Sequence, residues 1–304
     1  MSTPTITEAA GITRIETLYI QLLYRCQFRC AHCFHGDRLA WRDAYTLDQA
    51  ITLVELMQRD YATTGVNLLG GEPFLFYQLG PLLTHTKRTL GMHTEICTNG
   101  YRVIQKLAEV ATDLDLLRVS LEGLEQANDA IRHRGSFREA IAALAYARNL
   151  KIATGVTMTV TATNIADVVP LARLLETLAV RELKLHHLRP VGYASRHTEL
   201  VIPDPIAYQR MREQIEDANL RISVLVDDEL ATDRESEERA GAEYGATASR
   251  IESDPRGALT MSCNAVGTDA HAFYFDKQSG RIEHEGGGRN EVLLGIPPVV
   301  YAHA

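Results

Sequence analysis

The chain has 304 residues, of which 45% are hydrophobic and 23% charged, a balance typical of one large α/β domain with an appendage. Its 39 acidic and 31 basic side chains give a formal net charge of −8, which argues against a nucleic-acid partner and is compatible with a cationic small substrate. The N-terminal residues contain no apolar run of signal-peptide length, and no later stretch reaches the ~20 apolar residues of a membrane span, so we expect a cytoplasmic protein without a membrane partner.

Short apolar strands alternate with amphipathic helices from residue 18 to residue 188. Between the strands, apolar residues recur at i, i+3 and i+4, which indicates helices that cover a sheet. This alternation is typical of repeated βα units around a parallel sheet. The predicted strands cover residues 18–23, 65–69, 93–97, 115–121, 153–160 and 182–188.

These units are too few for a closed eight-unit barrel, so the predicted fold class is α/β, a partial (β/α)6 barrel with a small α+β C-terminal extension. We expect the repeat to stop after Pro190. An acidic, alanine-rich stretch at residues 227–245 then separates it from a segment of hairpin character. The break predicts two domains, residues 1–195 and residues 196–304.

Three cysteines lie in one polar loop directly after the first predicted strand. Cys26, Cys30 and Cys33 have the spacing C-x3-C-x2-C. Thiolates are soft ligands that suit iron–sulfur clusters, and three of them reach three corners of a cubane and leave the fourth iron open. A zinc site is the alternative, although zinc normally takes four ligands in two separated pairs. The other two cysteines, Cys97 and Cys263, are far apart, which excludes an extracellular disulfide framework and favours a reducing compartment.

Further motifs follow the next predicted strands in order, namely GGEP at 70–73, TNG at 98–100 and SLEG at 120–123. Together with the cysteine loop they make residues 17–190 resemble the radical S-adenosylmethionine superfamily. The resemblance implies that Cys26, Cys30 and Cys33 hold one [4Fe-4S] cluster, whose open iron binds S-adenosylmethionine. It also implies reductive cleavage to a 5′-deoxyadenosyl radical and an electron donor such as flavodoxin or ferredoxin.

The resemblance also assigns cofactor contacts to single residues. Glu122 stands where relatives carry an aspartate, and Arg134 would pair with the cofactor carboxylate. For the GGEP run the alternative is an ordinary βα turn, and for Arg134 it is a surface arginine. The residues implied to contact S-adenosylmethionine are His32, Phe34, Gly70, Gly71, Glu72, Pro73, Thr98, Asn99, Ser120, Glu122, Arg134, Asn164 and Leu188.

The C-terminal segment resembles the first half of a twitch or SPASM module, which in relatives binds auxiliary clusters. Cys263 begins this segment, but His284 stands where relatives carry the second cysteine. The resemblance therefore implies a module that keeps its shape without a metal. The alternative is a second cluster with histidine or foreign ligands.

Cys263 has two interpretations. A lone cysteine is usually a small buried apolar residue. The chain also resembles single-cluster radical epimerases of the neomycin C epimerase type, which implies that Cys263 returns a hydrogen atom to the opposite face of a substrate radical during antibiotic biosynthesis. The substrate would then be an aminoglycoside or a similar sugar, received by the carboxylates at residues 227–229, which otherwise form a solvated face.

Other reactions of the same fold remain open. A dehydrogenase or decarboxylase of a small molecule would need no hydrogen donor. A peptide-modifying enzyme usually carries an N-terminal peptide-recognition domain, for which the ~16 residues before the first strand leave no room. His186 and His187 are candidates for the barrel interior, but strand alternation alone does not say which of them points inward.

Overall fold

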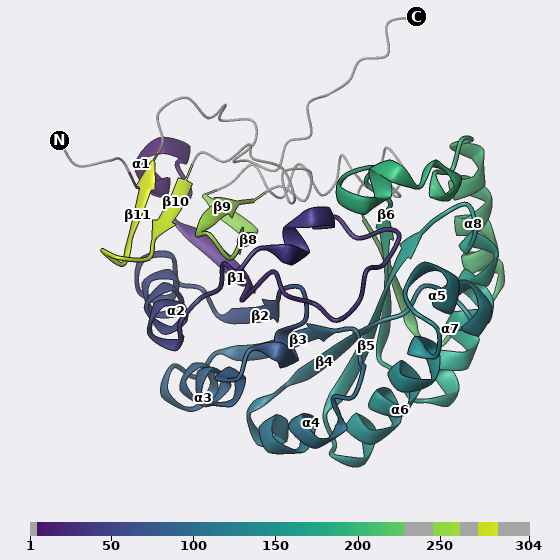
Figure 1. Cartoon of the computed structure of the whole chain (residues 1–304), viewed down its shortest axis with the longest axis horizontal. Helices are drawn as coiled ribbons and strands as arrows, with labels where there is room; N and C mark the ends of the chain where they lie inside the picture. Colours follow the sequence, from purple (N-terminus) through teal and green to yellow (C-terminus); the bar gives the residue numbers. More distant parts are fainter. Residues whose placement is uncertain (1–4, 228–245, 262–272, 285–304) are drawn as a thin grey trace, which may run out of the picture.

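The computed structural model describes residues 5–227, 246–261 and 273–284, which form an α/β fold around one curved sheet (Figure 1). The described strands make an 11-stranded sheet in the order β11-β10-β9-β8-β1-β2-β3-β4-β5-β6-β7. The parallel strands that follow each other in chain order are β1 (Arg14–Gln21), β2 (Gly65–Leu69), β3 (His93–Thr98), β4 (Leu116–Ser120), β5 (Ala153–Val160), β6 (Glu182–His187) and β7 (Ser223–Val226).

The described helices are α1 (Ile6–Ala10), α2 (Leu47–Tyr61), α3 (Leu79–Thr84), α4 (Ile104–Val110), α5 (Glu125–Ile131), α6 (Ser136–Asn149), α7 (Val168–Thr177) and α8 (Ile206–Asp217). Figure 1 shows α2, α3, α4, α6, α7 and α8 along the outer side of the sheet, as expected for a partial βα barrel. The α/β fold class predicted from the sequence is therefore confirmed.

Helix α2 shows how the local sequence builds this layer. Thr46 caps its N-terminus, because the Thr46 hydroxyl accepts from the Gln49 amide and the Gln49 side chain accepts from the Thr46 amide. Leu53, Val54 and Met57 are spaced to share one face and are fully buried. Each buried side chain of this size contributes about 1.5–3 kcal/mol of hydrophobic stabilisation.

The expectation that the βα repeat stops after Pro190 is wrong. Helix α8 and strand β7 continue it, and β7 pairs in parallel with β6. Strand β8 (Thr247–Ser253) pairs in parallel with β1 on the side away from β2. The sequence does not predict these elements, because α8 has only one fully buried residue, Met211, and β8 consists mostly of polar residues. Neither segment therefore shows a strong apolar periodicity. The boundary after residue 195 remains a prediction.

The hairpin predicted near the C-terminus is present. Strands β9 (Ala258–Thr260), β10 (Phe273–Asp276) and β11 (Arg281–His284) extend the sheet in antiparallel fashion beyond β8. Cys263 and most of the acidic stretch lie outside the described residues. None of the helices in the described part of the chain has the length and apolarity of a membrane span.

Candidate active site

The cysteine loop is anchored to the glycine turn that follows β2. The Gly71 amide donates to the Leu23 carbonyl at 2.7 Å, and the Glu72 amide donates to the Arg25 carbonyl at 3.0 Å. A Cβ on Gly71 would lie 2.2 Å from the Tyr24 carbonyl oxygen. The second glycine is therefore required by the backbone of the cysteine loop itself, because no side chain fits between the two segments.

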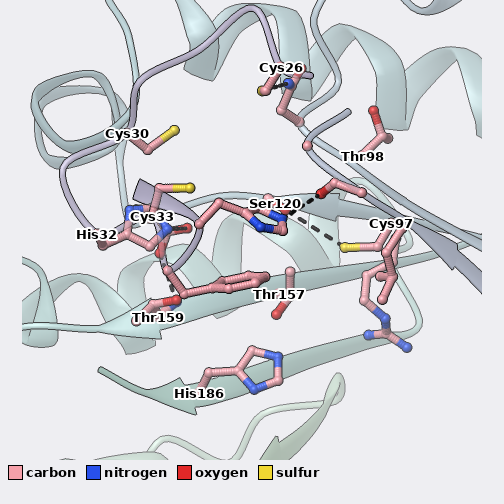
Figure 2. Close-up of a pocket in the computed structure, with 18 of the residues that line it drawn as sticks. Cys26, Cys30, His32, Cys33, Cys97, Thr98, Ser120, Thr157, Thr159 and His186 are labelled. Carbon is pink, nitrogen blue, oxygen red and sulfur yellow. Dashed lines mark hydrogen bonds and ion pairs between the residues drawn. The ribbon is translucent and has the colours of Figure 1, made fainter. Parts of the chain in front are cut away.

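Cys26, Cys30 and Cys33 surround a common space at one end of a cavity (Figure 2). Burial raises the pKa of the Cys26 and Cys30 thiols to about 11, so these sulfurs need a cationic group beside them to ionise. The Phe28 amide donates to the Cys26 sulfur at 3.4 Å. This donor set fits three corners of an iron–sulfur cluster.

A single metal ion would need a tighter arrangement. Among the described residues, no group of three or more His, Cys, Asp or Glu side chains is placed to hold one metal ion. A cluster requires a different spacing, because each thiolate binds its own iron.

The Glu72 carboxylate lies behind the glycine turn and is fully buried. It accepts hydrogen bonds from the Thr98 hydroxyl at 2.7 Å, the Asn99 amide at 2.9 Å and the Phe74 amide at 3.1 Å. Burial outweighs these bonds and raises the pKa of Glu72. Glu72 and Pro73 do not line the cavity. The structure thus gives Glu72 the task of joining the ends of β2 and β3, whereas Gly70, Gly71, Thr98 and Asn99 reach the cavity wall.

A buried cluster of charges stands beside the cysteines. Glu122, 1% exposed, accepts from the Arg132 guanidinium, from the Thr159 amide at 2.7 Å, and from His32 Nε2 at 3.2 Å. Burial alone would raise the pKa of Glu122, but His32 and Arg132 hold it at about 2. The carboxylate is therefore negative at neutral pH although it is buried.

Arg132, rather than Arg134, reaches the cavity. Arg134 is exposed in the turn before α6. Arg132 directly follows α5, and its guanidinium donates to the buried Glu122 carboxylate, which holds the side chain at the cavity.

Asn164 also differs from expectation in its position. It is fully buried and donates to the Thr159 carbonyl at 2.9 Å and the Glu122 carbonyl at 3.3 Å, so it supports the Glu122 backbone without lining the cavity. The predicted site residues that the structure does bring to one cavity are Cys26, Cys30, His32, Cys33, Phe34, Gly70, Gly71, Thr98, Asn99, Ser120, Glu122 and Leu188.

The far end of the cavity is polar. Figure 2 shows Thr157, Thr159 and His186 beyond the cysteines, on neighbouring strands. Every second residue of the parallel strands faces this interior. His186 and His187, the two candidates for the barrel interior, both line the cavity. The interior residues not assigned from the sequence are Tyr19, Asn67, Cys97, Arg118, Thr157, Thr159, Lys184, Arg250 and Glu252.

Ion pairs organise this polar end. Arg118 Nε donates to Glu95 at 2.6 Å, and its Nη2 donates to Glu182. His186 Nδ1 lies 2.6 Å from an Asp227 carboxylate oxygen. Because a carboxylate only accepts, His186 carries a proton on Nδ1 and its Nε2 is left for another partner.

Buried polar atoms at this end that have no hydrogen-bond partner among the described residues include Arg118 Nη1 and two oxygens. The two oxygens are the amide oxygen of Asn67 and the hydroxyl of Thr157, and both residues line the cavity. A buried polar atom without a partner costs about 1–3 kcal/mol, which a bound polar ligand would recover. The arrangement can therefore hold a hydroxylated or charged small molecule facing the cysteines.

Comparisons with known proteins agree with this geometry. The sequence pattern of the Radical SAM superfamily matches residues 20–175. The pre-heme d1 synthase of Dinoroseobacter shibae is 27% identical over 198 residues, which cover 64% of this chain and 48% of that protein. The mycofactocin maturase MftC of Mycobacterium tuberculosis is 29% identical over 180 residues, which cover 57% of this chain and 44% of that protein.

A solved structure shows the same fold. Streptococcus suis SuiB, crystallised with its precursor peptide SuiA, superimposes with a TM-score of 0.67 at 16% identity, over 86% of this chain and 63% of SuiB. The chain spans about half the length of the curated relatives it matches.

Proposed function

Because the chain belongs to the radical SAM superfamily, we propose that it takes a hydrogen atom from a small polar substrate held in this cavity. The observation that carries the proposal is the continuity of the cavity, which joins the cysteine loop to the charged side chains of β4, β6 and β8. A substrate at the polar end therefore lies open to a radical formed beside the cysteines, in a site shielded by protein.

The cofactors of this family are a [4Fe-4S] cluster and S-adenosylmethionine, which together supply the 5′-deoxyadenosyl radical. Cys26, Cys30 and Cys33 would hold the cluster. Glu122, kept negative by Arg132, would accept hydrogen bonds from the hydroxyl groups of the nucleoside.

The polar end would orient the substrate. Thr157 and Asn67 offer unpartnered oxygens, and Asp227 orients His186 so that Nε2 is free to bind a substrate hydroxyl or amine. Lys184 and Asp227 provide charges of both signs, which suits a substrate with several polar groups.

The test is anaerobic reconstitution with iron and sulfide, followed by dithionite and S-adenosylmethionine. We expect about four iron atoms per chain and formation of 5′-deoxyadenosine. Replacing Cys26, Cys30 or Cys33 by Ala should abolish both, while Cys97→Ala keeps the iron. About eight iron atoms per chain would contradict the single cluster, and no 5′-deoxyadenosine from the wild-type protein would contradict the function.

For the outcome of the reaction we retain epimerisation of an aminoglycoside or similar sugar. It is supported by the sequence resemblance and by Cys263, which lies outside the described residues. The 5′-deoxyadenosyl radical would take a hydrogen atom from one face of a carbon, and the Cys263 thiol would return one to the other face. The resulting thiyl radical regains one electron and one proton, the electron coming from a donor such as flavodoxin or ferredoxin.

Neomycin C in deuterated water is the probe for this outcome. Solvent deuterium at an inverted carbon supports a thiol donor, because S–H exchanges with water. If the Cys263→Ala variant still epimerises neomycin C cleanly, Cys263 is not the hydrogen donor. If the active enzyme leaves neomycin C unchanged, the aminoglycoside proposal fails.

A peptide substrate is the second candidate. It is favoured by the names of two similar proteins, the mycofactocin maturase and SuiB with its precursor peptide. A polar side chain of a peptide would occupy the same end of the cavity. Oxidation or decarboxylation of a small molecule remains a further alternative, distinguished by the product of the same incubation.

A further inference from the structure

The surface around the cysteine loop is basic in a chain whose net charge is −8. The four segments that border the loop, residues 23–36, 70–78, 98–108 and 131–138, contain seven Lys or Arg residues and one acid, Glu72, which is buried. Asp37, Glu109 and Glu139 follow directly after three of these segments, and Glu139 accepts a hydrogen bond from the Arg102 amide, so the excess of basic residues is smaller than within the segments alone. Arg132 and Arg138 are neutralised by Glu122 and Glu125. We define the remaining exposed residues as the basic rim, made of Arg25, Arg29, Arg102, Lys106 and Arg134.

We propose that the basic rim is the docking surface for an acidic one-electron carrier protein. The inference rests on the proposed function, because a carrier has a task only if the three cysteines hold a cluster. Each transfer oxidises the carrier by one electron and reduces the cluster by one electron.

One side of the basic rim frames the turn Pro73–Leu75. Arg25 Nη2 donates to the Leu75 carbonyl at 3.0 Å, and Lys106 Nζ donates to the Phe74 carbonyl at 2.6 Å. Two cations from distant segments are thus held beside the same three-residue turn. Tyr77, just beyond this turn, is 85% exposed and offers an aromatic surface between charges.

The other side of the basic rim is organised by Phe28, which lies between Cys26 and Cys30. The Phe28 ring stacks on His133 at 5.2 Å and contacts Tyr101 at 5.3 Å. The Arg102 guanidinium lies over the Tyr101 ring at 5.0 Å, and Arg134 follows His133. The rim is therefore continuous with the loop that carries the ligands.

Within this loop, Arg29 Nη1 donates to the Cys26 carbonyl at 3.2 Å, so a rim cation is bonded to a ligand residue. Electron transfer slows steeply with distance, so a carrier must dock close to the ligands. The residues of the rim are not among those that line the cavity, so the rim faces outward and leaves the substrate path free.

Charge complementarity identifies the partner as acidic. Opposite charges speed association and orient the encounter, whereas a basic carrier would be repelled by the rim. Attraction between exposed charges is screened within about 8 Å at physiological salt, so the interaction must weaken with ionic strength.

The test compares Arg102→Glu/Lys106→Glu with Arg148→Glu/Arg210→Glu. Both double variants change the net charge equally, but Arg148 on α6 and Arg210 on α8 lie outside the rim. The probe is flavodoxin, an acidic carrier. Arg102 and Lys106 are chosen because Arg25 and Arg29 are too close to the ligands for a clean substitution.

Two measurements decide the proposal. In a binding titration at low salt, the rim variant should bind oxidised flavodoxin about tenfold more weakly than the wild type, and the difference should shrink as salt rises. With reduced flavodoxin, its rate of 5′-deoxyadenosine formation should fall by a similar factor. With dithionite, a small reductant, its rate should stay at the wild-type level.

Equal flavodoxin binding by the rim variant and the wild type would overturn the proposal, as would an equal loss in the control variant. Arg134→Glu, on the opposite side of Phe28, repeats the binding test at a residue without a role in the turn. If the wild-type protein yields no 5′-deoxyadenosine with dithionite, the proposed function fails, whatever the binding result.

Discussion

Gly155 on β5 has no side chain, and the Arg118 guanidinium crosses β5 at this position as it extends from β4 to β6. A Cβ on Gly155 would lie 3.1 Å from Arg118 Nη1. Through this gap Arg118 reaches Glu182 on β6 while it keeps Glu95 on β3. One guanidinium therefore links β4 to β3 and, across β5, to β6.

Arg118→Leu should destabilise the protein by about 3–5 kcal/mol, because it leaves Glu95 and Glu182 partly buried without their cation. Urea unfolding at neutral pH measures this loss. Arg138→Leu is the matched control, since Arg138 pairs with Glu125 at the surface and its loss should cost less than about 1 kcal/mol. Equal losses in the two variants would show that the Arg118 network adds nothing beyond a surface ion pair.

Glu122 should make stability depend on acidity in a defined direction. Its pKa is depressed from 4.5 to about 2 in the folded protein, so between these values the unfolded chain binds more protons. The stability from this group is complete above the unfolded pKa and is lost as pH falls through about 2. Unfolding of wild type and Glu122→Gln without cofactors should therefore differ most near neutral pH and converge in acid. A difference that stays constant with pH would contradict the depressed pKa.

Asp227 should fix the tautomer of His186. With the carboxylate present, the Nδ1 atom carries the proton and Nε2 is the unprotonated ring nitrogen. Nitrogen NMR of histidine-labelled protein should show the Nδ1–H form of His186 in the wild type and a shift towards the other tautomer in Asp227→Asn. His85, whose Nε2 lies 2.9 Å from Glu55 at the surface, should be unaffected in the same spectrum. An unchanged His186 signal would remove Asp227 from this role.

Gly71→Ala should prevent assembly of the cluster. Its Cβ would lie 2.2 Å from the Tyr24 carbonyl oxygen and 2.4 Å from that of Arg25, so the cysteine loop has to move. Iron bound after reconstitution should fall well below about four atoms per chain. Gly80→Ala is the control, because its Cβ meets only a Val110 methyl at 3.9 Å and alanine favours the helix. Full iron content in Gly71→Ala would show that the loop tolerates the shift.

The predictions for the cysteines and glycines rest on motifs of a few consecutive residues. The three thiols and the GGEP turn are each local in the sequence, and the structure places Cys26, Cys30, Cys33, Gly70 and Gly71 at one end of the cavity. The residues beside them at the cavity were predictable from the order of the parallel strands, because the carboxyl ends of parallel strands lie at the same edge of the sheet.

The polar interior was not predictable in the same way. Strands of a parallel sheet are covered on both faces, so polar residues such as Arg118 and Lys184 do not reveal which face is enclosed. Their partners come from other strands, as Glu95 and Asp227 show, and only the curvature of the sheet brings them together. Strands β7 and β8 were not predicted for a related reason, because β7 has only four residues and β8 carries mostly polar residues, so neither shows a clear strand pattern.

The choice between Arg132 and Arg134 gives the last prediction. Both residues occur in the segment after α5, and the sequence favoured Arg134, but only Arg132 reaches Glu122 and the cavity. Arg132→Lys keeps the charge and loses the paired N–H donors that hold Glu122. Equilibrium dialysis with reconstituted protein should show S-adenosylmethionine binding about tenfold weaker in Arg132→Lys and unchanged in Arg134→Lys. The reverse pattern would return the role to Arg134 and would mean that the turn before α6 folds over the cavity when the cofactor binds.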